Sequence, residues 1–102
     1  MRYLITAYDG KEEGTFERRM SVRQDHLANV LSVKEYGSVI CAGGLPDEDG
    51  KLIGSYLVME FESRELLDRY LESEPYLIND VWKDVSIVPC YVTIKDDEFV
   101  GK

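Results

Sequence analysis

The stretch that decides the fold is residues 38–61, SVICAGGLPDEDGKLIGSYLVMEF. It holds two apolar segments, 38–45 and 53–61, which are predicted to be β-strands. Between them, Pro46 to Gly50 form a polar turn. Two consecutive strands joined by a turn, with no helix between them, point to an antiparallel sheet.

The segments on either side of this stretch add one strand and one helix each. On the N-terminal side, residues 2–8 alternate as a strand that Asp9-Gly10 breaks, and residues 16–36 form a long helix that Gly37 stops. On the C-terminal side, Ser63 caps a helix over 64–73 and Pro75 ends it. A connector follows over 76–84, with room for one helical turn, and then a strand over 85–94.

The predicted order of elements is β-α-β-β-α-β. This order is the ferredoxin-like α+β plan, a four-stranded antiparallel sheet with both helices on one face. In that plan the second and fourth strands are the edges, and Pro89 in the fourth strand agrees because proline is tolerated at an edge. Cys41 and Cys90 would then lie on opposite edges, too far apart for a disulfide.

Both faces of the predicted sheet carry apolar side chains, although two helices can cover only one of them. In the third strand Leu57, Met59 and Phe61 share one face, whereas Tyr56 and Val58 lie on the other. An exposed apolar sheet normally marks an interface, so we expect a homodimer in which two sheets pack face to face. The alternative is a second face that is partly polar and tolerates water.

Length and composition restrict the class of protein. The chain of 102 residues makes one domain, predicted over 1–95, with a charged and frayed tail over 96–102. The net charge of −8 argues against nucleic acid and anionic membranes as partners. No apolar run is long enough to cross a bilayer or to act as a signal peptide, and the cysteines fit no paired spacing, so the expected location is cytoplasmic.

The same inventory argues against a bound metal ion. With one histidine and two unpaired cysteines, the usual ligands cannot assemble a transition-metal site. The acidic run Asp47-Glu48-Asp49-Gly50 lacks the spacing of a calcium loop and is predicted to be a solvated turn.

His26, the only histidine, lies inside the first predicted helix. At 100° per residue, Val22, Val30 and Val33 fall within about 40° of it, and Met20, Leu27 and Leu31 extend that apolar arc. Histidine is the side chain that most readily exchanges a proton near neutral pH. His26 is therefore either a residue at the edge of the core, with its polar atoms satisfied by a hydrogen bond, or a residue that lines a functional pocket.

Glu74, in the run Glu74-Pro75-Tyr76, ends the second predicted helix. Because both helices lie side by side on one face, its carboxylate could approach His26. The two would form an acid–base pair in which the carboxylate fixes the imidazole tautomer and the other ring nitrogen moves a proton. The alternative is a solvated helix end.

The chain resembles the YciI-like (YCII-related) family over about residues 2–92. No single motif is very specific, but the order and spacing of the motifs are. The resemblance rests on Tyr3-x-Ile5-x-Ala7-x-Asp9, Arg18, Arg23-x-x-His26-Leu27, Ala42-Gly43, Gly54-Ser55, Phe61-Glu62-Ser63 and Glu74-Pro75-Tyr76.

The resemblance implies a dimeric ferredoxin-like α/β-barrel with a small pocket lined by a His–Asp pair, and acid–base chemistry without a dedicated cofactor. His26 matches the family histidine, and Glu74 stands where the family usually has aspartate. The extra methylene moves the carboxylate by about 1–1.5 Å, a displacement that can cost about a hundredfold in rate. The pocket geometry must adjust to the longer side chain, or the activity is lost.

Three more residues are candidates for substrate contacts. Arg23 could hold a substrate carboxylate, or form an ion pair with a nearby acid. Ser55 could donate into the pocket, or bond local backbone. Tyr76 could close the pocket, or anchor the connector.

These observations favour a small cofactor-independent lyase, isomerase or hydrolase acting on a small molecule, with His26 and Glu74 as the catalytic pair. The alternative is a non-catalytic dimeric module that binds a metabolite or regulates. A third hypothesis, an oxygenase that uses no metal, is supported only by analogy with proteins of related fold. An RNA-recognition module shares the order of elements, but the strongly negative charge argues against it.

Overall fold

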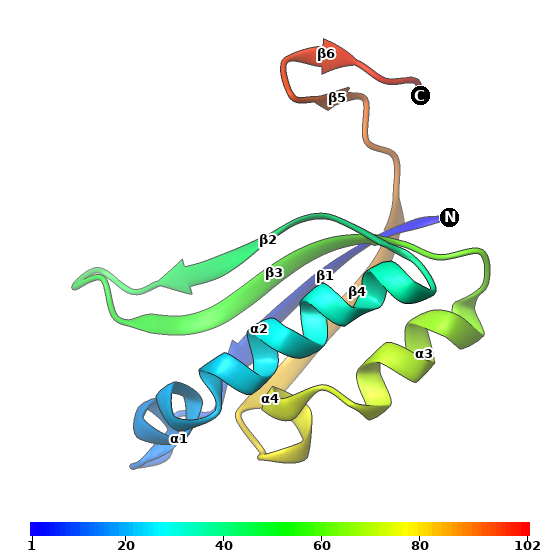
Figure 1. The fold of residues 1–102 in the computed structure, drawn as a ribbon. Helices are drawn as coiled ribbons and strands as arrows, with labels where there is room; N and C mark the ends of the chain where they lie inside the picture. The colour runs from blue at the N-terminus through cyan, green and yellow to red at the C-terminus, as the bar shows by residue number, and fades with distance from the viewer.

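The computed structural model describes all residues 1–102, and its strands and helices follow the predicted order (Figure 1). The main elements are β1 (Arg2–Asp9), α1 (Thr15–Ser21), α2 (Arg23–Ser32), β2 (Ser38–Pro46), β3 (Leu52–Glu60), α3 (Arg64–Glu72), α4 (Pro75–Ile78) and β4 (Trp82–Cys90). A 3₁₀ turn, η1 (Val33–Glu35), follows α2, and a small hairpin of β5 (Ile94–Lys95) and β6 (Glu98–Phe99) ends the chain.

The four long strands form one antiparallel sheet in the order β2-β3-β1-β4. All helices lie on one side of it, as Figure 1 shows. The predicted ferredoxin-like α+β plan is therefore confirmed. Cys41 on β2 and Cys90 on β4 lie on opposite edge strands and are free thiols.

The core lies between the sheet and the helices. It is built from alternate strand residues that face the helices, such as Ile5, Leu57 and Met59, each at most 1% exposed. From the helical layer, Val33 and Leu67 fill the same space. Ser63 begins α3 as predicted, because its Oγ accepts a hydrogen bond from the Leu66 N–H.

The other face of the sheet carries no helix. Its central row consists of four apolar residues on neighbouring strands, Cys41, Val58, Leu4 and Val88. The next row is more polar, with Gly43, Tyr56, Thr6 and Ser86. At Gly43 a Cβ atom would come within 2.6 Å of the Tyr56 ring, so any other residue there would force that ring to move. We call this surface, made of these two rows, the open face.

The helix predicted over 16–36 is wrong as a single element. It breaks at Val22, whose φ of −109° and ψ of 8° are not helical, and it divides into α1, α2 and η1. A β-branched residue has a low helix propensity, and Val22 also packs against the core. The predicted apolar arc is only partly buried: Val30 and Val33 are enclosed, whereas Met20, Leu27 and Leu31 are exposed.

The last predicted strand is also shifted. It was expected over 85–94 but runs from Trp82 to Cys90. The strand ends there because its neighbour β1 begins at Arg2, which pairs with Cys90. The tail, expected to be frayed, instead forms the β5–β6 hairpin. No helix of the structure is long and apolar enough to cross a membrane.

Candidate active site

The fold brings His26 and Glu74 into direct contact. His26 projects from α2 and Glu74 caps the start of α4, and the His26 Nδ1 and Glu74 Oε1 atoms are 2.6 Å apart. His26 is 7% exposed and Glu74 is completely buried. The core-edge position and the functional pairing predicted for His26 are therefore both compatible with its surroundings.

The Glu74 carboxylate has two further donors. The Tyr76 backbone N–H donates to Oε1 at 3.0 Å, and the Tyr70 hydroxyl donates to Oε2. Burial, with Glu74 adding to it, raises the pKa of Tyr70 far above its usual range, so its hydroxyl keeps its proton and remains a donor. Both Glu74 oxygens therefore accept hydrogen bonds from other groups, an arrangement that favours the His26 tautomer with its hydrogen on Nδ1.

The Nε2 atom of His26 is available to contact a substrate. It makes no hydrogen bond in the chain, and it is not among the fully enclosed polar atoms that lack a partner. A neutral imidazole with Nδ1–H held by a carboxylate presents Nε2 as a lone-pair acceptor. The arrangement can therefore take a proton at Nε2 and stabilise the resulting imidazolium.

Aromatic side chains hold the imidazole in place. Tyr76 stacks on it at 4.0 Å between ring centroids with planes 18° apart, and Trp82 meets it edge-on at 5.8 Å. The Arg19 guanidinium lies 4.6 Å from the centroid of the same Tyr76 ring. Tyr76 therefore contacts both the imidazole and the Arg19 guanidinium through its ring.

Arg19 is the centre of a second buried polar network. Its Nη1 donates to both oxygens of Asp9 at 2.8 and 2.9 Å, and its Nη2 donates to the Ser55 Oγ at 2.7 Å and to the Gly54 carbonyl at 2.9 Å. Trp82 Nε1 also donates to the Ser55 Oγ, at 3.2 Å. Burial raises the pKa of Asp9, and the Arg19 guanidinium offsets part of that rise. The network thus ties β1, α1 and β3 to the rings around His26.

The three predicted substrate residues have different surroundings. Arg23, one turn before His26, is half-buried and forms neither a hydrogen bond nor an ion pair within the chain. Tyr76 is 1% exposed, and burial raises the pKa of its hydroxyl, which has no hydrogen-bond partner in the chain. Ser55 is engaged by Arg19 and Trp82, so its substrate contact stays a prediction.

Sequence reasoning missed four residues of this cluster: Asp9, Arg19, Tyr70 and Trp82. Tyr70 lies four residues before Glu74, a spacing that places the two on one helix face and was a usable signal. Asp9 entered the sequence analysis only as a strand end and as part of the motif that carries the family resemblance. Nothing local in the sequence marks Arg19 or Trp82, because the partners of Arg19 lie 10 to 36 residues away and the partner of Trp82 lies 27 residues away.

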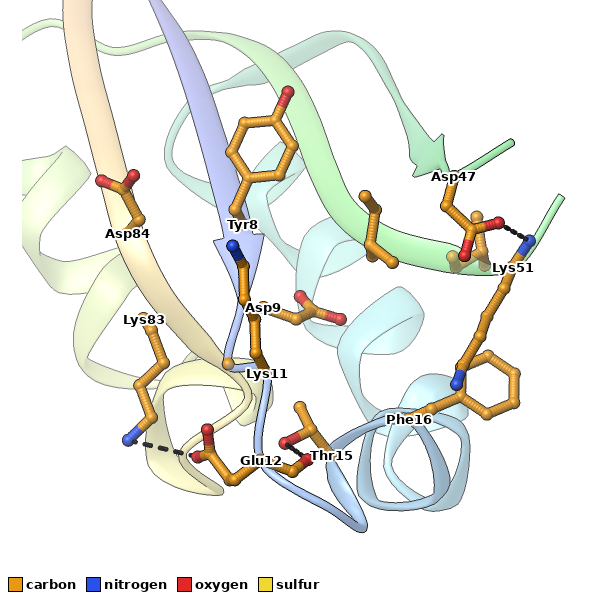
Figure 2. Close-up of a pocket in the computed structure, with 13 residues that line it drawn as sticks. Tyr8, Asp9, Lys11, Glu12, Thr15, Phe16, Asp47, Lys51, Lys83 and Asp84 are labelled. Atoms are coloured by element: carbon orange, nitrogen blue, oxygen red, sulfur yellow. Dashed lines mark hydrogen bonds and ion pairs between the residues drawn. The ribbon is translucent and has the colours of Figure 1, made fainter. Parts of the chain in front are cut away.

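A cavity of about 840 Å³ lies beside this cluster rather than at His26 (Figure 2). It opens between the end of β1, the start of α1 and the β2–β3 turn, and its lining carries Lys11, Lys51 and Lys83 beside several acids. It shares Asp9 with the Arg19 network. No group of three or more His, Cys, Asp or Glu side chains is placed to hold a metal ion.

Comparisons with known proteins agree with this fold. The sequence model of the YCII-related domain matches residues 1–91. Protein YciI of Escherichia coli O6:H1 is 33% identical over 95 residues, which cover 87% of this chain and 95% of the relative. An uncharacterized protein of Haemophilus influenzae is 28% identical over the same coverage.

Solved structures give the same picture. 5-Chloro-2-hydroxyhydroquinone dehydrochlorinase (TftG) from Burkholderia phenoliruptrix, solved with 2,5-dihydroxybenzoquinone, superposes with a TM-score of 0.75 at 22% identity, over 89% of this chain and 94% of that chain. PA3566 from Pseudomonas aeruginosa follows with a TM-score of 0.54 at 12% identity, over 89% and 91% of the two chains. The chain belongs to the YCII-related family, whose fold it shares over nearly its whole length.

Proposed function

We propose that this protein is a small-molecule enzyme in which the His26–Glu74 pair transfers a proton, with no dedicated cofactor. The observation that carries the proposal is the fully buried carboxylate at 2.6 Å from His26 Nδ1, with Nε2 left without a partner. Glu74 holds Nδ1–H, so Nε2 accepts the substrate proton, and the carboxylate then stabilises the imidazolium.

The glutamate in place of the usual aspartate is compatible with this role. Glu74 begins the short helix α4, and its side chain turns back to accept from the Tyr76 N–H while it reaches His26. The longer side chain thus spans the distance without opening a gap. We infer that the pair is competent, rather than a remnant of a lost activity.

Arg23 and Tyr76 indicate the kind of substrate. A half-buried guanidinium without an acidic partner favours an anionic or strongly polar group beside it. The Tyr76 hydroxyl remains protonated and can donate a hydrogen bond. TftG acts on a chlorinated, hydroxylated ring. We therefore propose a small substrate with an acidic hydroxyl or a carbonyl group, placed between Nε2 and Arg23.

The large cavity supports a second candidate function, a dimeric module that binds a metabolite without converting it. The cavity of about 840 Å³ is lined by side chains of both charge signs, and His26 is not among them. A ligand held there would involve the lysines around it rather than the acid–base pair.

We further propose that the working unit is a homodimer formed through the open face. The row of Cys41, Val58, Leu4 and Val88 crosses all four strands, and Val88 is 44% exposed. Sheet-to-sheet packing would remove this row from water. The two free cysteines accord with the reducing, cytoplasmic setting that we expect.

The experiment that tests the function compares wild-type protein with His26→Gln on a panel of small hydroquinones, chlorinated hydroquinones and hydroxyquinones. Chloride release and solvent deuterium incorporation report proton transfer, and a rise in melting temperature reports binding. We expect wild-type turnover of at least one compound and its loss in His26→Gln. Binding that raises the melting temperature, without consumption and with no dependence on His26, would favour the binding module instead.

A further inference from the structure

The chain ends in a hairpin whose turn is well formed. Ile94 pairs with Phe99 and Lys95 pairs with Glu98, and the two loop residues, Asp96 and Asp97, both have positive φ angles of 53° and 63°. Two loop residues with positive φ are the mark of the type I′ turn, which matches the twist of paired strands. The hairpin is therefore a defined element rather than a loose end.

This hairpin is not part of the sheet of its own domain. Its two strands form a sheet of their own, and Val100 extends it by donating to the Thr93 carbonyl at 2.8 Å. Figure 1 shows it beyond the end of β4, standing off the sheet on the side away from the helices. A lone two-stranded hairpin is at best marginally stable in water, so a packing surface must come from elsewhere.

The apolar side chains of the hairpin are exposed on one face. The cross-strand pair Ile94 and Phe99 is 65% and 75% exposed, and the neighbouring Tyr91 is 68% exposed. The pair Lys95 and Glu98 occupies the opposite face, because successive strand residues alternate. One apolar and one charged face is the pattern of a hairpin that packs against something on its apolar side.

We propose that residues 91–100 are an arm that packs, through Ile94 and Phe99, on a second copy of this chain. The proposal rests on the proposed homodimer. The open face and the arm lie on the same side of the sheet, and the chain that leaves Val88 on that face reaches two more exposed apolar residues, Tyr91 after the end of β4 and Ile94 in β5. A partner sheet seated on the open face would lie where the arm projects.

The arm lies beyond the part of the chain that matches the family model. That match covers residues 1–91, and the arm begins at its end. The core fold, with His26 and Glu74, is complete without it. The arm can therefore be altered while the domain remains folded, which makes the proposal directly testable.

The test compares the dimer dissociation constants of the wild-type protein, the Ile94→Ser/Phe99→Ser variant and the matched Lys95→Ser/Glu98→Ser variant, measured by sedimentation over a range of concentrations. We expect the apolar-face variant to dissociate at a concentration higher by about 100-fold or more, because each dimer buries two arms. The charged-face variant should remain within a few-fold of wild type. A chain that stops after Val92 should behave like the apolar-face variant.

Three results separate the possible failures. If the wild-type protein is a dimer and the apolar-face variant has the same dissociation constant, the arm proposal is wrong and the open-face dimer stands. If both hairpin variants weaken the dimer equally, the packing surface is not the one assigned to Ile94 and Phe99. If the wild-type protein is a monomer throughout, the proposed homodimer fails and the arm has no partner. The His26 proton NMR signals verify in each case that the domain is folded.

Discussion

Replacing Glu74 by glutamine should separate the charge of this side chain from its shape. Glutamine keeps an oxygen that can accept from His26 Nδ1–H and from the Tyr76 N–H, but its amide group replaces the Oε2 acceptor of Tyr70. The Tyr70 hydroxyl has no other acceptor in the chain. The side chain remains buried and the same size, so the change removes one negative charge and one hydrogen-bond pairing.

The structure sets the expected magnitudes. One buried hydroxyl without an acceptor costs about 1–3 kcal/mol, so Glu74→Gln should lower the free energy of unfolding by about that amount and leave the fold intact. The effect on turnover should be larger. Without the carboxylate, the imidazolium formed when Nε2 takes a proton is no longer stabilised, and the rate should fall by about 10²- to 10⁴-fold.

The assay pairs urea denaturation with turnover of a compound that the wild-type protein consumes. Glu72→Gln is the matched control, because it makes the same substitution two residues away at an exposed position. It should leave both quantities near the wild-type values. A Glu74→Gln protein that turns over substrate at the wild-type rate would refute the reasoning, because the buried charge would then have no part in the chemistry.

Three further predictions concern the surroundings of the pair. Arg19→Met removes the cation behind Tyr76 and leaves a buried carboxylate unpaired, so it should cost about 3–5 kcal/mol of stability and move the ring-proton shifts of His26. Tyr70 keeps its proton in the folded protein, whereas the unfolded chain loses it above about pH 10. This group should therefore lower the free energy of unfolding by about 1.4 kcal/mol for each pH unit above about pH 10. Urea denaturation of the Tyr70→Phe variant at the same pH values should lack this contribution. Asp97→Gly should relieve about 1 kcal/mol of turn strain and tighten the dimer in sedimentation runs.

The fold could be predicted because its signals are local. The turn between the two central strands, Gly37 after the first helical region and Pro75 after the second each mark a boundary within a few residues. The break at Val22 escaped prediction because the apolar periodicity continues through it. The early start of β4 escaped as well, because Lys83 and Asp84 suggest a loop although an edge strand exposes them to water.

The site could be predicted only as far as topology places residues together. His26 and Glu74 lie on segments that the ferredoxin-like plan brings side by side, and the structure joins them. The Arg19 network could not be predicted in this way. A buried arginine with an aspartate 10 residues earlier and a serine 36 residues later depends on side-chain directions that only the packed fold defines.

The protonation of the single imidazole tests the central claim most directly. Since His26 is the only histidine, a long-range proton–nitrogen NMR spectrum shows its tautomer without assignment by mutation. At a pH where the ring is neutral, we predict the hydrogen on Nδ1, bonded to Glu74, and an unprotonated Nε2. A ring that carries its hydrogen on Nε2 would contradict the account, because that nitrogen could not then take a proton from a substrate.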